Sequence, residues 1–321
     1  MKQWIRRISA GFFSLYFLTA SVFAARELIP VGEVIGLDLA AGEVTVAAFD
    51  EHLSSGRDAG LQIGDRILSV DGRNVDCAED VRKALRVSDG TVDLTVSRKN
   101  KEFALSMEPE ITPEGPKIGV YLRQGITGIG TVTWYDPDTG AFGTLGHGVN
   151  DGKGTLLPMT DGKAYPASIV SVQKGKSGQP GQLKGALDGS HLLGQLWKNT
   201  DQGVFGNCSK GWGGKAIPTA SYQDIRTGDA CIRSTVDSGA AREYSVEILK
   251  IYPKNRADCR NFLIRVTDPA LLEATGGIVQ GMSGSPIIQN GKLIGAVTHV
   301  LVNDPTTGYG IFIENMLDAA A

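Results

Sequence analysis

The sequence of 321 residues has little charge, few histidines and few cysteines, and each shortage excludes a class of protein. Charged residues make up 21% of the chain and the formal net charge is -3, which argues against a nucleic-acid partner, because nucleic-acid binders are usually basic. The four cysteines lack Cys-x-x-Cys spacing, and no histidine–cysteine cluster has the spacing of a zinc site. We therefore expect neither a metal nor a cofactor.

Long apolar runs are also scarce, and the one present lies at the N-terminus. A positively charged start is followed by an uncharged stretch over residues 8–25, and Val22-Phe23-Ala24 fits the small-residue rule for cleavage after Ala24. Residues 1–25 are predicted to be a signal peptide or an uncleaved anchor, because the stretch is just long enough to span a bilayer. We expect export, with membrane contact only through this segment.

The cysteines leave two alternatives open. An exported protein can pair its cysteines as disulfides, but their connectivity does not follow from the sequence. Four unpaired buried thiols are the other alternative. The residues concerned are Cys77, Cys208, Cys231 and Cys259.

Glycine is abundant, with 42 residues, which indicates many turns and short strands. Residues 118–149 are expected to form successive hairpins, with a turn at residues 136–140. A further hairpin is predicted at Asn290-Gly291. Asp268–Thr275 is expected to be a short helix with Asp268 as its N-cap. The fold class is therefore mainly β, with an antiparallel β-barrel.

Prolines at residues 109–117 predict a linker that divides the chain. The module before it, residues 26–108, contains a predicted helix over residues 77–87, in which Val81, Ala84 and Leu85 share one face. A hairpin from "TVDLTVSRK" and "KEFALSM" closes this module. Residues 118–321 form the second domain.

The segment "DAGLQIGDRILSVDG", residues 58–72, resembles a PDZ domain, with apolar positions and two glycine turns in the expected places. The resemblance implies that an extended peptide is added as a strand to a sheet edge. The loop that would receive the peptide carboxylate is expected within "VGEVIGLDL". This loop departs from the usual glycine–aromatic pattern, so internal or self-derived peptides, or no ligand, remain open. The predicted peptide-binding residues are Gly32, Val34, Ile35, Gly36 and Leu37.

A serine lies between two glycines in "GMSGSP", residues 281–286. Acyl transfer to a serine needs a base, an orienting acid and an oxyanion hole. His147, between glycines in "GTLGHGVND", is the predicted base, and His299 is the alternative. The motif resembles the nucleophile loop of chymotrypsin-like serine proteases. This implies Ser283 as nucleophile, with Ser285 as competitor, and the amides of Gly281 and Ser283 as the oxyanion hole.

Over a longer range the chain resembles the SpoIVB peptidase family. The likeness includes the leader, the PDZ module, "GTLGHGVND" and "VTDPALLEATGGIVQGMSGSPIIQNGKLIGAVTHVLVNDPTTGYGIFIENML", in the same domain order. It implies a double β-barrel serine peptidase over residues 118–321, with Asp268 as the triad acid. Chymotrypsin-like order usually separates acid and serine by more chain, so other acids remain open: Asp151, Asp161, Asp224 and Asp229.

The resemblance also implies a function. The family's member is a sporulation signalling endopeptidase that cleaves itself and the membrane-bound regulatory subunit restraining an intramembrane metalloprotease, which leads to activation of the late mother-cell sigma factor. Its place is the intermembrane space of the forespore. Two alternatives remain: an HtrA-like quality-control protease, in which the PDZ domain follows the protease, and an inactive PDZ-bearing binding protein.

Overall fold

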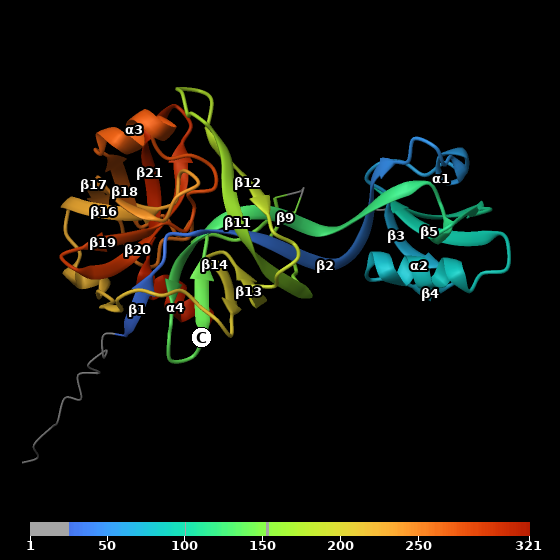
Figure 1. Cartoon of the computed structure of the whole chain (residues 1–321), viewed down its shortest axis with the longest axis horizontal. Coiled ribbons are helices and arrows are strands. Elements are labelled where there is room, and N and C mark those ends of the chain that lie inside the picture. The colour runs from blue at the N-terminus through green and yellow to red at the C-terminus, as the bar shows by residue number, and fades with distance from the viewer. Residues whose placement is uncertain (1–25, 100, 152–153) are drawn as a thin grey trace, which may run out of the picture.

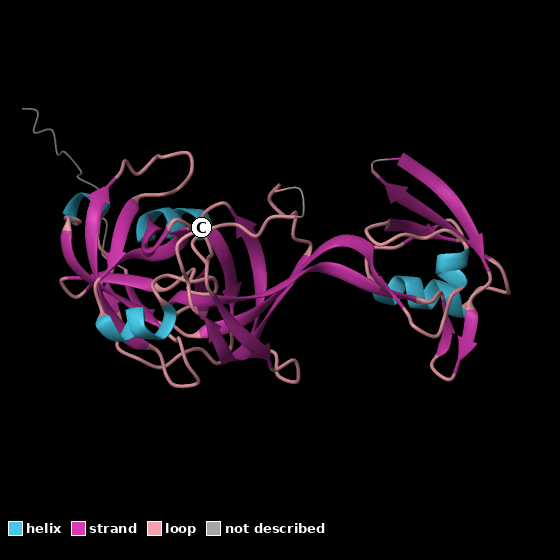
Figure 2. Ribbon diagram, turned by 90° about the horizontal axis from the view of Figure 1, so that it is seen from above, coloured by secondary structure: helices cyan, strands magenta, loops and turns pink. Residues whose placement is uncertain are grey.

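The computed structural model describes residues 26–99, 101–151 and 154–321. These residues form a large β-rich lobe and a smaller lobe, joined by two long strands (Figures 1 and 2). The predicted signal peptide or anchor, residues 1–25, lies outside the described residues. Among the described helices, none is long and apolar enough to cross a membrane.

The smaller lobe has the elements expected of a PDZ domain. The predicted helix is α2 (Ala78–Arg86), which buries Val81, Ala84 and Leu85 as its sequence pattern predicts. The predicted hairpin is also confirmed, because β5 pairs with β6 along its whole length. The remaining elements are α1 (Ser55–Asp58), β3 (Arg66–Val70), β4 (Arg73–Asn74), β5 (Val92–Arg98), β6 (Lys101–Met107), β7 (Glu110–Thr112) and β8 (Gly115–Lys117).

Two strands, β2 (Val34–Phe49) and β9 (Val120–Tyr135), run through both lobes as an antiparallel ribbon. Their pairing extends from Val34 opposite Thr131 to Phe49 opposite Val120. This corrects the predicted boundaries, because residues 27–39 belong to the large lobe and not to the PDZ module. The predicted linker, residues 109–117, forms the β7–β8 hairpin, and the chain crosses between lobes within β2 and β9 instead.

The predicted turn at residues 136–140 is confirmed, because β9 and β10 (Ala141–Thr144) pair antiparallel across it. Before this turn, the single long strand β9 replaces the successive hairpins predicted for its sequence. Its glycines are sites of close approach instead of turns. A Cβ at Gly125 would lie 1.7 Å from the Leu39 carbonyl oxygen, and one at Gly130 would lie 2.3 Å from the Leu145 side chain. Glycine therefore lets neighbouring backbone and side chains pack against β9 without ending the strand.

The first barrel closes because β2 pairs with both β11 and β9. The order around it is β9, β10, β14, β13, β11 and β2. Leu37, Leu39, Val132 and Phe142 lie in its buried core. The elements are β1 (Glu27–Pro30), β10 (Ala141–Thr144), β11 (Asp161–Gln173), β12 (Gln182–Leu187), β13 (Gly194–Thr200), β14 (Gly203–Asn207) and β15 (Ile217–Pro218).

The second barrel is a closed ring of six strands, so the predicted double β-barrel is confirmed. The hairpin at Asn290-Gly291 joins β19 to β20, and α3 (Pro269–Thr275) begins after its N-cap Asp268, both as predicted. A C-terminal helix, α4 (Ile313–Ala320), was not predicted. The other elements are η1 (Tyr222–Asp224), β16 (Gly228–Ser234), β17 (Arg242–Ile251), β18 (Phe262–Val266), β19 (Pro286–Gln289), β20 (Lys292–Leu301) and β21 (Asp304–Phe312).

Candidate active site

A cavity of about 450 Å³ is lined by residues of both barrels. The first barrel contributes residues of β2 and β9 and the segment after β10, which carries His147. The second barrel contributes the segment before β19, with Gly281 and Ser283, and part of β20, with His299. The structure thus brings the predicted base, the predicted nucleophile and one predicted oxyanion residue together from distant parts of the sequence.

The nucleophile loop requires glycine on both sides of the serine. Gly281 has φ +99° and Gly284 has φ +98°, which is a region that side chains disfavour. A Cβ at Gly284 would also lie 1.9 Å from the Thr131 carbonyl oxygen. The loop therefore folds tightly against β9, and the glycines in "GMSGSP" are needed for this shape.

Two threonines of β9 hold the loop in place. The Thr131 hydroxyl donates to the Gly281 carbonyl and the Thr133 hydroxyl donates to the Gly284 carbonyl, both at 2.7 Å. The Thr131 amide also donates to the Ser283 carbonyl at 3.0 Å. Both threonine side chains are fully buried, so these hydrogen bonds set the path of the loop away from water.

The predicted oxyanion-hole amides are available. Neighbouring amides are occupied, since Met282 donates to the Val279 carbonyl and Gly284 donates to the Val297 carbonyl. Within the described part of the chain, the amides of Gly281 and Ser283 donate to no protein acceptor. Two free amides beside a serine are the donors that a developing oxyanion needs.

The Ser283 hydroxyl donates to the Thr298 carbonyl at 2.7 Å, and no hydrogen bond joins it to His147 among the described residues. The arrangement is therefore that of a resting site, in which the serine must rotate toward the base. The competitor Ser285 is fully buried and its hydroxyl bonds to Met282 and Ser234. It lies outside the cavity lining, so it has a structural role.

His147 is held by the backbone. Its Nδ1 lies 2.9 Å from the Gly148 carbonyl oxygen, so Nδ1 carries the proton and Nε2 remains the acceptor. That is the tautomer a general base requires. Burial lowers the pKa of His147 below its ordinary value, although the hydrogen bond to Gly148 opposes this. The base is therefore neutral at neutral pH.

The predicted triad acid does not contact this site. The Asp268 carboxylate accepts from the amides of Ala270, Leu271 and Ser245, at 2.9, 3.1 and 3.3 Å, and thereby caps α3. None of the four alternative acids lines the cavity either. Among the described residues, the cavity lining contains no carboxylate. The triad acid stays a prediction without a contact in this structure.

His299, which the sequence offered as an alternative base, lies in the same cavity. Its ring centroid is 5.1 Å from that of His147, with the planes tilted by 43°. Its Nδ1 is buried and has no hydrogen-bond partner in the described part of the chain. Burial, followed by the proximity of His147, lowers the pKa of His299 to about 4. No pattern in the sequence indicated that both histidines would line one cavity.

The residues predicted to bind a peptide in the PDZ module lie elsewhere, and this prediction is corrected. Val34, Ile35, Gly36 and Leu37 pair with β11 and β9 in the first barrel. Gly32 accepts hydrogen bonds from Thr235. None of these residues belongs to the PDZ lobe, because β2 enters that lobe only in its second half.

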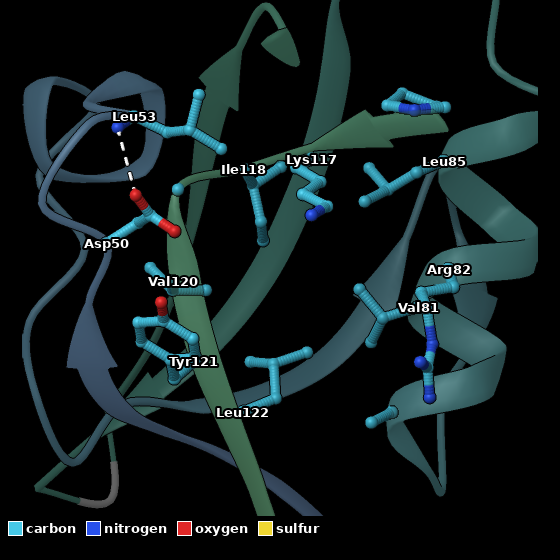
Figure 3. Close-up of a pocket in the computed structure, with 13 residues that line it drawn as sticks. Asp50, Leu53, Val81, Arg82, Leu85, Lys117, Ile118, Val120, Tyr121 and Leu122 are labelled. Carbon is cyan, nitrogen blue, oxygen red and sulfur yellow. Dashed lines mark hydrogen bonds between the residues drawn. The ribbon is translucent and has the colours of Figure 1, made fainter. Parts of the chain in front are cut away.

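The PDZ lobe has its groove at the start of β9 instead (Figure 3). This cavity of about 270 Å³ lies between β9 and α2. Ile118 and Leu122 lie on the strand side, and Val81 and Leu85 on the helix side. Over residues 120–124, one edge of β9 pairs with β2, whereas the other edge, which faces α2, pairs with no described strand.

The groove ends at Gly119. It has φ +66°, and a Cβ there would lie 2.7 Å from the Leu53 carbonyl oxygen. Its amide donates to no protein acceptor in the described residues, and the exposed Lys117 lies beside it. The groove therefore ends at a glycine turn with a free amide, where Lys117 is ion-paired with Glu114 and Asp50 also lines the cavity.

Comparison with known families gives two matches. The family described as SpoIVB peptidase S55 matches residues 114–317, which is more than half of the chain. A PDZ domain matches residues 54–98, within the smaller lobe. Both matches agree with the resemblance found in the sequence.

Curated relatives match over a shorter stretch. The putative zinc metalloprotease Atu1380 of Agrobacterium fabrum is 33% identical over 133 residues, which are 40% of this chain and 33% of that protein. The putative zinc metalloprotease R01501 of Rhizobium meliloti is 29% identical over 133 residues, again 40% of this chain and 33% of that protein. This chain spans about a third of these relatives. Among the described residues, no group of three or more His, Cys, Asp or Glu could hold a metal ion.

Solved structures show only weak overall likeness. The active form of the Rv3671c protease from M. tuberculosis matches with a TM-score of 0.37 and 14% identity, over 60% of this chain and 73% of that chain. An HtrA-type protease, AlgW with a decapeptide, matches with a TM-score of 0.38 and 14% identity, over 73% of this chain and 64% of that chain. With TM-scores below 0.5, these likenesses carry no argument about function.

Proposed function

The chain belongs to the SpoIVB peptidase S55 family and is a serine peptidase with a PDZ domain, and from this premise we propose that it is a sporulation signalling endopeptidase. Its substrates would be itself and the membrane-bound regulatory subunit that restrains an intramembrane metalloprotease. Cleavage would lead to activation of the late mother-cell sigma factor. The charge-free segment before residue 26 supports export, and the intermembrane space of the forespore is the proposed location.

One observation carries the catalytic part of this proposal: His147 and Ser283 line one cavity beside two free amides. His147 Nε2 takes the proton of the Ser283 hydroxyl as its oxygen attacks a peptide carbonyl carbon. The carbonyl oxygen becomes an oxyanion that the Gly281 and Ser283 amides stabilise. The imidazolium then gives its proton to the leaving amine, and water hydrolyses the acyl-enzyme in a second round.

The cavity also indicates which peptides fit. Its walls beside Ser283 are predominantly apolar, and few charged groups could pair with a charged substrate side chain. We therefore expect cleavage next to an apolar residue, because burial of an apolar side chain favours binding by about 25 cal/mol per Å². The apolar lining residues are Leu37, Leu39, Ile126, Ile129, Ile278 and Val300.

The PDZ groove supplies a second contact for a protein partner. A peptide added to the free edge of β9 would lie between Leu122 and Val81, with its end at Gly119. Such a contact, remote from the cavity, favours a few defined substrates over many unfolded ones. The domain order separates the alternatives, because here the PDZ domain precedes the peptidase domain, whereas in the HtrA-like alternative it follows.

The test uses self-cleavage. The purified chain is followed on a gel beside Ser283→Ala, and separately with the regulatory subunit and with unfolded casein. Discrete fragments of the chain and of the regulatory subunit in the parent alone are expected. Rapid general degradation of casein without discrete cuts would favour the quality-control alternative. Unchanged cutting by Ser283→Ala would contradict the assignment of the nucleophile.

A further inference from the structure

One edge of β9 leads from the PDZ groove to the active-site cavity. β2 occupies the opposite edge of β9 over residues 120–124 and again over residues 126–131. Over residues 120–130, no described strand pairs with the edge that β2 leaves free. At the end of this free edge, the Thr131 amide donates to the Ser283 carbonyl at 3.0 Å. The free edge therefore ends at the nucleophile itself.

The two cavities lie close together along this strand. Leu122 is the last residue of β9 that lines the PDZ groove, and Ile126 is the first that lines the active-site cavity. Strand residues are spaced by about 3.3 Å, so the gap between the two is about 13 Å. Midway in this gap, the Gln124 side chain accepts from the Ala78 amide at 3.0 Å and thereby ties the start of α2 to β9.

Gly128 marks a place on β9 where another chain can approach. Gly125 and Gly130 are in close contact with neighbours, but a Cβ at Gly128 would meet nothing within 4 Å. Gly128 has no positive φ either, so its backbone conformation does not require glycine. A glycine inside a strand often marks the close approach of a ligand or of another backbone. Gly128 is exposed and lines the active-site cavity, which is where a substrate lies.

The catalytic chemistry sets the direction of a chain on this edge. His147 gives its proton to the leaving amine, so the residues that follow the scissile bond begin beside His147, on the side of the first barrel. β2 and β9 form the wall of the cavity on that side, and they continue from there to the PDZ lobe (Figure 2). A substrate segment that follows this wall away from Ser283 runs opposite to β9, as an antiparallel strand does.

We propose that the substrate segment after the scissile bond is added to β9 as an antiparallel strand and that its far end occupies the PDZ groove. The segment has about ten residues, the distance in sequence from Gly119 to Ile129, because each residue of an antiparallel strand faces one residue of its partner. Apolar side chains near its far end meet Val81 and Leu85 of α2. This inference rests on the proposed peptidase activity and adds that the PDZ domain recognises the leaving side of the cut.

The first test varies the length of the substrate on each side of the cut. Peptides from a digest of bacterial proteins are incubated with the purified full chain, and mass spectrometry locates the cuts. Synthetic copies of the best substrates are then shortened. We expect kcat/KM to rise at least tenfold as the leaving segment grows from about three to about ten residues, because two linked contacts increase apparent affinity by about 10²–10⁴-fold. Lengthening the acyl side beyond about four residues is the control and should change kcat/KM less than about threefold.

A proline scan of the leaving segment tests whether it pairs as a strand. Proline removes the amide donor, and in a strand every second amide faces the partner. Proline at the third to tenth residue should therefore lower kcat/KM about tenfold or more at alternate positions and have little effect between them. Equal losses at all positions, or no loss at any, would overturn the inference, and so would a dependence on the acyl side alone.

A pair of variants at Thr127 tests the same edge from the side of the protein. The Thr131 amide faces away from β2, so by alternation the Thr127 amide also faces the free edge. Thr127→Pro removes this donor and places a ring on the edge. Thr127→Val is the matched control, because it loses the same hydroxyl, which donates to Asp38 at 3.1 Å, and keeps the amide.

We expect the advantage of ten-residue over three-residue leaving segments to fall to about twofold or less in Thr127→Pro and to remain parental in Thr127→Val. Melting temperatures within a few degrees of the parent show that both variants fold. A parental advantage in a folded Thr127→Pro would contradict strand addition to β9.

Failure of the proposed function looks different. A fluorophosphonate reacts with an activated serine and needs no leaving segment, so its rate of reaction with Ser283 reports the catalytic site alone. A parent chain that neither reacts with the fluorophosphonate nor cuts any peptide would refute the peptidase activity. A parent chain that reacts and cuts peptides equally well whatever the length of the leaving segment would refute only the role of β9 and the PDZ groove.

Discussion

Replacing Thr131 by valine removes one hydroxyl from the support of the nucleophile loop and keeps its shape. In the structure this hydroxyl donates to the Gly281 carbonyl at 2.7 Å, and Thr131 is fully buried. The amide of Gly281 is one of the two free donors proposed for the oxyanion hole. Thr131→Val should therefore leave Gly281 less firmly positioned, and the amide of Gly281 is one of the two proposed donors to the oxyanion.

Two effects of different size follow. Leaving the Gly281 carbonyl without its donor should reduce the free energy of unfolding by about 1–3 kcal/mol. Each kcal/mol lowers the melting temperature by about 2–4 °C in a chain of this size. A shift of the loop near 1 Å would cost up to about 10²-fold in rate. We expect the kcat of Thr131→Val to fall by about 10–100-fold, with KM nearly unchanged.

The assay follows kcat on a peptide substrate and the fluorophosphonate rate, together with thermal unfolding. Thr307→Val is the control, because Thr307 is also buried and its hydroxyl donates to the Asp304 carboxylate, outside the active-site cavity. Thr307→Val should lose stability but keep its rate. If Thr131→Val loses stability and reacts within twofold of the parent, the hydroxyl supports the fold alone and the reasoning about the oxyanion hole is refuted.

Three further predictions concern the loop, the histidine pair and the groove. Gly284→Ala should destabilise the chain by about 3 kcal/mol or more in urea unfolding, because its Cβ would overlap the Thr131 carbonyl; parental stability would contradict the loop geometry. The pKa of His299 is lowered to about 4 in the folded chain, so between pH 6.5 and 4 the unfolded chain binds a proton at this histidine and the folded chain does not. The free energy of unfolding should therefore fall by about 1–3 kcal/mol over this pH range, and by less in His299→Phe. Gly119→Ala should weaken binding of a fluorescent peptide with an apolar C-terminus about tenfold, measured by anisotropy, and equal affinity would exclude Gly119 from the groove.

Local sequence signals predicted local structure well. Asp268 followed by proline predicts an N-cap, because the aspartate oxygen can reach two free amides of the first turn whatever surrounds the helix. Asn290-Gly291 predicts a two-residue hairpin for a similar reason, since both residues tolerate positive φ. The glycines on either side of Ser283 likewise predict a tight loop with positive φ, and both Gly281 and Gly284 have positive φ in the structure.

Signals that depend on distant partners were read wrongly. Glycines at residues 125, 128 and 130 suggested turns, although at Gly125 and Gly130 the structure shows close approach of Leu39 and Leu145 to β9. The same limit explains the peptide-binding loop. Residues 32–37 were predicted because "VGEVIGLDL" occupies the place of the peptide-binding loop in the sequence, but only the structure reveals that residues 118–122 lie opposite α2. Spacing along the chain could not show that His299 faces His147.

The strand that was mispredicted is also the one that connects the two functional regions. β9 begins at the PDZ groove with Val120 and reaches the nucleophile loop at Thr131 and Thr133. A peptide added to its first residues would extend the sheet whose far end holds the Gly281 and Gly284 carbonyls. β2 pairs with β9 at both ends of this length, with register shifts between Leu39 and Val44 and between Val46 and Ala48. The Thr131 amide donates to the Ser283 carbonyl and its hydroxyl donates to the Gly281 carbonyl, so β9 contacts both the nucleophile and the residue that supplies an oxyanion amide.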